Sequence, residues 1–125
     1  MWKYANPNPK GRKTGDCAVR ALAITEDLPW HEAHDLLHEY AADLGVIENN
    51  NAAIAAFLKD RGYTRHVIPD TCPACYTVAD FCREHPEGTF VLGTGSHVIA
   101  VKSGNWIDSW NSADEIPIYY WEAPK

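Results

Sequence analysis

The chain has 125 residues, and 11 lysines and arginines stand against 17 aspartates and glutamates, which gives a formal net charge of −6. This length favours one globular domain over residues 1–125, because two half-sized cores would each bury too little surface. Apolar residues make up 46% and charged residues 22%, which excludes the fibrous and disordered classes. The acidic balance disfavours nucleic acid as a partner.

The sequence also carries no sign of membrane insertion or export. No apolar run approaches the ~20 residues of a membrane span, and residues 1–13 lack the apolar core of a signal peptide. We therefore expect a cytoplasmic protein without a membrane partner. In that compartment the cysteines are expected as thiols rather than disulfides.

A helix is predicted from Cys17 to about Thr25. Its apolar residues cover nearly the whole circumference, which is typical of a buried helix. Asp16 stands at the position of the N-cap, directly after Gly15. The chain therefore enters a buried helix with a cysteine in the first turn.

Three more helices are predicted along the chain. Apolar residues recur at helical spacing over residues 29–45 and 51–61, and each of these segments ends at or just before a glycine. Thr77 with Asp80 three positions later has the pattern of a capping box, so a short helix should follow and end before Pro86.

From Thr89 onward the apolar period changes to two, which predicts strands. The predicted strands cover residues 89–92, 97–101, 106–110 and 116–121, with a short earlier strand over 63–68. Helices followed by a strand meander define an α+β protein. We expect the Cys17 helix to pack against an antiparallel sheet formed by the C-terminal half.

Cys17 is the first candidate for chemistry. Backbone N–H groups and the helix dipole at the first turn of a helix stabilise a thiolate and lower its pKa. Cysteine is also one of the most buried residue types, so a small apolar core residue is the competing interpretation.

His97 and Asp108 are the second and third candidates. If residues 103–104 form the loop of a hairpin, Ile99 faces Asp108 and His97 lies diagonally from it on the same face. Diagonal neighbours are about 7–8 Å apart at Cα, a gap that these side chains can close. A carboxylate would then orient the imidazole that a cysteine nucleophile needs.

These segments resemble the papain-like cysteine protease superfamily. The resemblance rests on Gly15-Asp16-Cys17 before a buried helix, on His97 within residues 95–101, and on Asp108-Ser109-Trp110. It is closest to small papain-like peptidase domains encoded by bacteria and phages, which implies the cytoplasm of a bacterial or phage-infected cell. It implies Cys17 as nucleophile, His97 as general base and acid, and Asp108 as the group that orients the imidazole.

The resemblance further implies hydrolysis of an amide, peptide or isopeptide bond in a peptide or protein substrate, without a cofactor. Papain-like enzymes usually place a glutamine before the cysteine as an oxyanion donor, and this chain contains no glutamine. Asn6 or Asn8 could donate instead. Asp16 and Trp110 are further candidates for substrate contact.

Two other functions remain open from the sequence. The scaffold could be catalytically weak or inactive and serve as a protein-binding or host-modulating module. Alternatively, the chain could be a small zinc-binding module, because three cysteines and one histidine follow a spacing that suits tetrahedral zinc. These four residues are Cys72, Cys75, Cys82 and His85.

Overall fold

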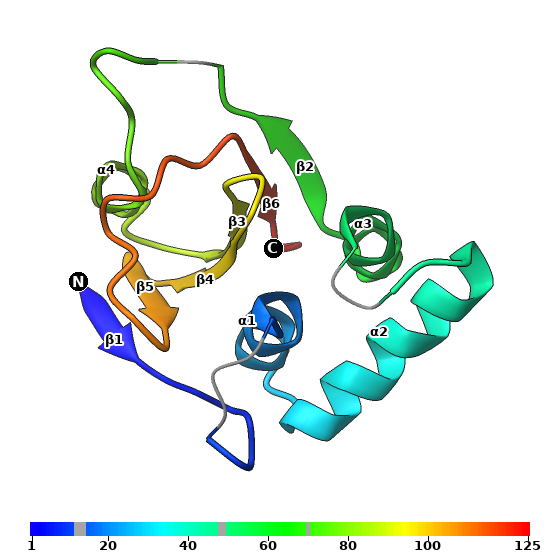
Figure 1. Cartoon of the computed structure of the whole chain (residues 1–125). Coiled ribbons are helices and arrows are strands. Elements are labelled where there is room, and N and C mark those ends of the chain that lie inside the picture. The colour runs from blue at the N-terminus through cyan, green and yellow to red at the C-terminus, as the bar shows by residue number, and fades with distance from the viewer. Residues whose placement is uncertain (12–14, 48–49, 70) are drawn as a thin grey trace.

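The computed structural model describes residues 1–11, 15–47, 50–69 and 71–125. These parts of the chain form an α+β structure with four helices and a six-stranded mixed sheet (Figure 1). The helices are α1 (Cys17–Thr25), α2 (Trp30–Leu44), α3 (Asn51–Asp60) and α4 (Val78–Glu84). The strands are β1 (Trp2–Tyr4), β2 (Thr64–Val67), β3 (Thr89–Gly93), β4 (Val98–Lys102), β5 (Asn105–Asp108) and β6 (Tyr119–Glu122).

The sheet has the order β1-β5-β4-β3-β6-β2. The prediction of a purely antiparallel sheet is wrong, because one pair of strands is parallel. Strand β1 pairs in parallel with β5, with Tyr4 opposite Asp108. The sequence analysis missed β1 because it has only three residues, all exposed, and therefore shows no alternation of burial. The sheet also includes β1 from the N-terminal half, so it is not built from the C-terminal half alone.

The hairpin of β4 and β5 has the predicted register. Lys102 pairs with Asn105 across a two-residue loop, and Ser103 and Gly104 both have positive φ angles, of 52° and 75°. Two positive φ angles define the type I′ turn, whose twist matches that of the strands it joins. Strand β4 begins at Val98, so His97 lies just before the strand rather than within it.

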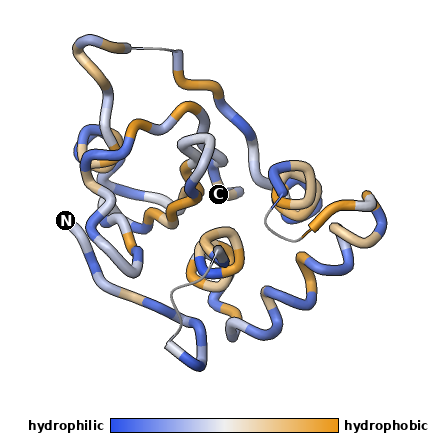
Figure 2. The backbone as a smooth tube through the Cα atoms, in the orientation of Figure 1, coloured by the Kyte–Doolittle hydropathy of each residue, from blue (hydrophilic) through white to orange (hydrophobic). Residues whose placement is uncertain are grey.

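Successive side chains along the strands point to opposite faces of the sheet, and each face packs in its own hydrophobic core. On one face, Val91 and Trp121 pack with apolar residues of α1, α2 and α3. On the other face, Phe90 and Leu92 pack with α4. Figure 2 shows the difference between the helices: apolar residues dominate α1, whereas polar and apolar residues alternate along α2. Helix α1 is therefore the buried helix that the sequence predicts, with eight of its nine residues buried.

The predicted helix boundaries hold to within one residue or two. Helix α2 ends at Gly45, which takes the left-handed conformation typical of a helix C-terminus. Helix α4 has the predicted capping box, with both hydrogen bonds between Thr77 and Asp80 present. None of the helices in the described parts combines the length and the apolar character that a membrane crossing requires.

The expectation that all cysteines are thiols is wrong for one pair. Cys72 and Cys75 form a disulfide in the connection between β2 and α4, whereas Cys17 and Cys82 are buried and are not disulfide-bonded. The two bonded residues are only three positions apart, so the turn between them brings their side chains together whatever the rest of the fold does.

Gly93 at the end of β3 permits a close approach that no other residue would allow. A Cβ atom at this position would overlap the ring of Tyr119 on the neighbouring strand β6. We expect Gly93→Ala to lower the free energy of unfolding by about 1–3 kcal/mol, the usual cost of overpacking. Urea denaturation measures this loss.

Gly15→Ala is the matched control for that substitution. A Cβ atom at Gly15 meets none of the described atoms within 4 Å, and this glycine does not have a positive φ angle. Its stability should stay within about 0.5 kcal/mol of the wild type. Equal stability of the two variants would show that Tyr119 is free to move away from Gly93.

Candidate active site

Cys17 lies at the first residue of α1, where the sequence analysis places it. Its side chain is buried, with 8% of the residue exposed. It contributes to the wall of a cavity of about 220 Å³. The other described residues that line this cavity are Asn50, Asn51, Gly95, Ser96, His97, Val98 and Tyr119. The thiol is therefore largely buried at the edge of a small cavity.

His97 lines the same cavity as the thiol. A turn fixes its backbone, because Thr94 N–H donates to the His97 carbonyl and His97 N–H donates to the Thr94 hydroxyl. Its Nε2 lies 2.6 Å from Oδ2 of Asp108, and its side chain also hydrogen-bonds to Cys17. With Nε2 held by Asp108, Nδ1 is the ring nitrogen left to exchange a proton with the thiol.

Asp108 is fixed at the end of β5 and is 4% exposed. The Ser112 hydroxyl donates to the same Oδ2 that contacts His97, at 2.9 Å, and the Ser109 N–H donates to Oδ1 at 2.8 Å. Two donors besides the imidazole therefore hold this carboxylate. A carboxylate fixed in this way can orient an imidazole and stabilise its positive charge.

A buried arginine connects Asp108 to the start of α1. Arg20 forms an ion pair with Asp16, four positions earlier on the same helix, and its Nη2 lies 3.8 Å from Oδ1 of Asp108. Asp16 also accepts a hydrogen bond from Nε1 of Trp30, at 2.9 Å. Two buried carboxylates thus share one guanidinium, and this arrangement joins the cysteine helix to the strand that carries Asp108.

The environment of His97 favours its protonated form. Burial alone lowers the pKa of the imidazole, but the hydrogen bonds to Asp108 and Cys17 and the charges of both groups outweigh it and raise the pKa to about 9. An imidazolium beside a cysteine stabilises the thiolate that acts as the nucleophile.

Trp110 lies next to His97. Its ring centroid is 5.0 Å from that of His97, and the residue is 44% exposed. It follows β5 rather than belonging to it, because the strand ends at Asp108. A large apolar surface beside the imidazole is available to a substrate that approaches the thiol.

The three polar candidates near the N-terminus have partners within the fold. Nδ2 of Asn8 donates to Asp16 at 3.3 Å, and Oδ1 of Asn6 accepts from the backbone N–H of Asn8 at 3.2 Å. Asp16 occupies the N-cap position of α1, but its side chain makes no capping hydrogen bond and binds Arg20 and Trp30 instead. None of the three belongs to the described wall of the cavity.

The structure adds residues that the sequence analysis did not single out. Asn50 and Asn51 line the cavity from the start of α3, and Tyr119 lines it from β6. The Tyr119 hydroxyl donates to Oδ1 of Asn51 at 3.4 Å. The sequence shows a run of asparagines at the start of a predicted helix, but such a run does not indicate any one function. Only the fold shows that this helix begins opposite Cys17.

The proposed zinc ligands do not come together. Cys72 and Cys75 are bonded to each other, and burial raises the pKa of Cys82 to about 11, which disfavours the thiolate that a metal needs. Nδ1 of His85 is within 2.8 Å of the Phe81 carbonyl. Among the described residues, no group of three or more cysteines, histidines and carboxylates could hold a metal ion.

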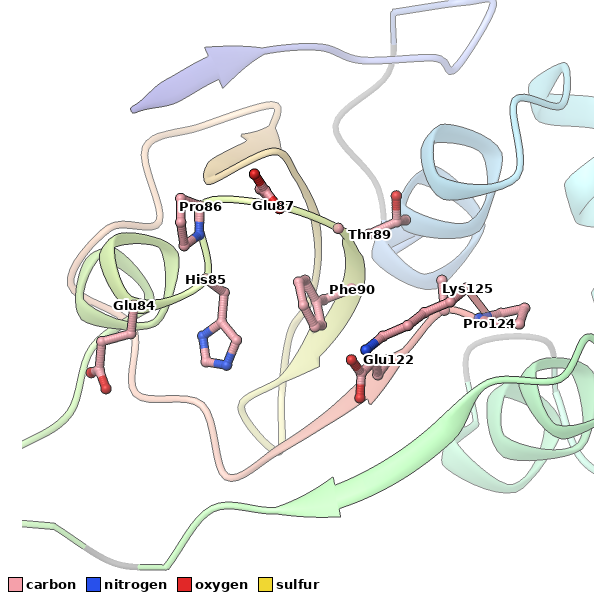
Figure 3. Close-up of a pocket in the computed structure, with 11 residues that line it drawn as sticks. Glu84, His85, Pro86, Glu87, Thr89, Phe90, Glu122, Pro124 and Lys125 are labelled. Atoms are coloured by element: carbon pink, nitrogen blue, oxygen red, sulfur yellow. The ribbon is translucent and has the colours of Figure 1, made fainter.

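A second and larger cavity, of about 650 Å³, lies away from the thiol. Figure 3 shows His85, Phe90 and Glu122 among its lining residues, with Lys125 nearby. Phe90 belongs to the core on the α4 side of the sheet, so this cavity opens on the face opposite α1. Cys17, His97 and Asp108 do not line it. The small cavity is therefore the one that holds reactive groups.

Comparisons of the chain with protein-family models, curated proteins and solved structures find no match. The chemistry of the site is therefore inferred from its own geometry.

The raised pKa of His97 should depend on Asp108. Asp108→Asn removes the negative charge next to the imidazole, so we expect the pKa of His97 to fall from about 9 by roughly one to three pH units. An NMR titration of the His97 ring proton measures this change. An unchanged titration would contradict the role assigned to the carboxylate.

The same shift predicts the pH dependence of stability. Because the folded pKa of His97 lies above the ordinary 6.5, its protonation stabilises the folded state fully below about pH 6.5. This stabilisation is lost as the pH rises through about 9. The loss over this interval should be smaller in Asp108→Asn, as measured by urea denaturation at several pH values.

Arg20 should be important for stability as well as for geometry. Arg20→Met removes the cation that pairs with Asp16 and lies near Asp108, and breaking a buried ion pair in this way costs about 3–5 kcal/mol. The matched control is Arg83→Met, which removes an exposed ion pair with Asp80 and should cost less than about 1 kcal/mol. Similar losses in urea denaturation would contradict the role of the buried network.

Proposed function

We propose that this chain is a minimal papain-like cysteine hydrolase that cleaves an amide, peptide or isopeptide bond in a peptide or protein substrate. The observation that carries the proposal is the contact of His97 with both Asp108 and Cys17 at a cavity. A helix-borne thiol, an imidazole and a carboxylate in this order are the parts that thiol hydrolysis needs.

In the first step the Cys17 thiolate attacks the carbonyl carbon of the substrate. A bond forms between Sγ and that carbon, and the electron pair of the C=O bond moves onto the oxygen. The C–N bond then breaks as the tetrahedral intermediate collapses, and the leaving amine takes the proton that His97 carries. The products of this step are a free amine and a thioester on Cys17.

Water completes the reaction in the second step. His97, now neutral, accepts a proton from the water while the oxygen attacks the thioester carbon. The C–S bond breaks, the acid product leaves, and the departing sulfur is again a thiolate beside an imidazolium. Asp108 holds the ring in place during both steps and stays ionised.

The oxyanion of the intermediate needs hydrogen-bond donors. The backbone N–H of Cys17 is one candidate, because N–H groups at the start of a helix point toward an anion and the helix dipole favours negative charge there. Asn51 is a second candidate, because it lines the same cavity. Asn8 supports this role less well, since its amide donates to Asp16.

Alkylation of Cys17 by iodoacetamide tests the activated thiol without knowledge of the substrate. We expect labelling to be rapid at about pH 6, well below the ~8.5 pKa of a free thiol. His97→Ala should slow the labelling at that pH by an order of magnitude or more, because the cation beside the sulfur is lost. Peptide mass spectrometry assigns the label to individual cysteines.

Cys82 is an internal control in the same molecule. It is a free, buried thiol whose pKa is raised to about 11, so it should label slowly in both proteins. A Cys17 that reacts as slowly as an ordinary thiol, with no effect of His97→Ala, would contradict the proposal. The protein-binding scaffold would then be the better interpretation of the fold.

A further inference from the structure

The wall of the small cavity shows what kind of substrate can reach the thiol. Apart from Cys17 and His97, the described wall consists of two asparagines, a glycine, a serine, a valine and a tyrosine. Its volume of about 220 Å³ is below the roughly 300 Å³ at which pockets for drug-sized ligands begin. The cavity is therefore small and largely polar.

A substrate has to enter this cavity in order to react. Cys17 is only 8% exposed, and a reacting carbonyl carbon has to approach Sγ to about 3–3.5 Å. The carbon next to that carbonyl then lies inside the cavity as well. Any side chain on this carbon would compete for space with the surrounding residues.

The part of the cavity wall that Tyr119 forms is held in place by its packing. The ring of Tyr119 fills the space above Gly93, and the guanidinium of Arg65 lies 4.8 Å from the centre of the ring. The Tyr119 hydroxyl donates a hydrogen bond to Oδ1 of Asn51. Tyr119 is 7% exposed and belongs to the core that includes α1. A bulky substrate would therefore have to displace packed side chains.

We propose that the cavity selects substrates in which the attacked carbonyl belongs to glycine, and that Asn51 hydrogen-bonds the peptide carbonyl that precedes this glycine. This inference rests on the proposed thiol hydrolase. Because Oδ1 of Asn51 accepts from Tyr119, its Nδ2 is the part of the amide that donates to a peptide carbonyl. Glycine fits because it adds no side chain to the occupied space.

Two electrophilic probes test this selectivity. Acetyl-Gly-Gly vinyl methyl ester and acetyl-Gly-Phe vinyl methyl ester differ only in the side chain next to the electrophile. In both, Sγ bonds to the alkene carbon β to the ester, which takes the place of the attacked carbonyl carbon, and a proton adds to the carbon next to the ester, so no leaving group is needed. We expect the glycine probe to label Cys17 at least about tenfold faster.

Two variants test the role of the wall, with each probe rate divided by the iodoacetamide rate of the same protein. Asn51→Ala removes a hydrogen bond and opens the exposed side of the cavity. The normalised rate of the glycine probe should fall about fivefold, and its advantage over the phenylalanine probe should shrink. Tyr119→Phe keeps the ring and removes only the hydroxyl, so it should lower the normalised glycine rate by a smaller factor.

Glu87→Ala is the control, because Glu87 lines the larger cavity on the other face of the sheet. It should leave both probe rates unchanged. Equal labelling by the two probes, or normalised rates that Asn51→Ala does not change, would overturn the glycine selectivity while the hydrolase proposal stands. Slow iodoacetamide labelling of wild-type Cys17 would instead overturn the hydrolase, and this inference with it.

Discussion

The arrangement of the site depends on one buried cation, Arg20. Its guanidinium neutralises Asp16 at the start of the cysteine helix and lies close to Asp108 at the end of β5. A charge removed from water is tolerated only when it is paired, and the guanidinium therefore favours packing in which the start of α1 lies against the end of β5. The same packing places the thiol next to the imidazole. The same interaction therefore contributes both to the fold and to the geometry of the proposed chemistry.

The sequence predicts most of the elements because their signals are local. The mostly apolar helix at Cys17, the capping box at Thr77 and the turn after Lys102 each depend on neighbouring residues. The hairpin register follows from that turn, and it brings His97 and Asp108 within reach of each other. The contact of His97 with Cys17 was inferred from a resemblance, since no local rule joins positions 80 residues apart.

What the sequence does not predict comes from contacts between distant segments. Strand β1 is too short to show a period, and only its pairing with β5 makes it a strand. Arg20 looks like a polar interruption in an apolar helix until the two carboxylates around it are known. Asn51 is a candidate for substrate contact only because α3 begins at the cavity, which the sequence does not predict. The Cys72–Cys75 bond was missed for a different reason, since thiols were inferred from the expected compartment.

The placement of the three reacting groups has a consequence for synthesis of the protein. Cys17 is made early, whereas the β5 strand that ends at Asp108 emerges from the ribosome about 90 residues later, at roughly 5–20 residues per second. Until then the thiol has neither its imidazole partner nor the carboxylate that orients it. The proposed hydrolytic activity would therefore arise only after β4 and β5 have joined the sheet. For such a hydrolase, this delay would separate the synthesis of the chain from the onset of its activity.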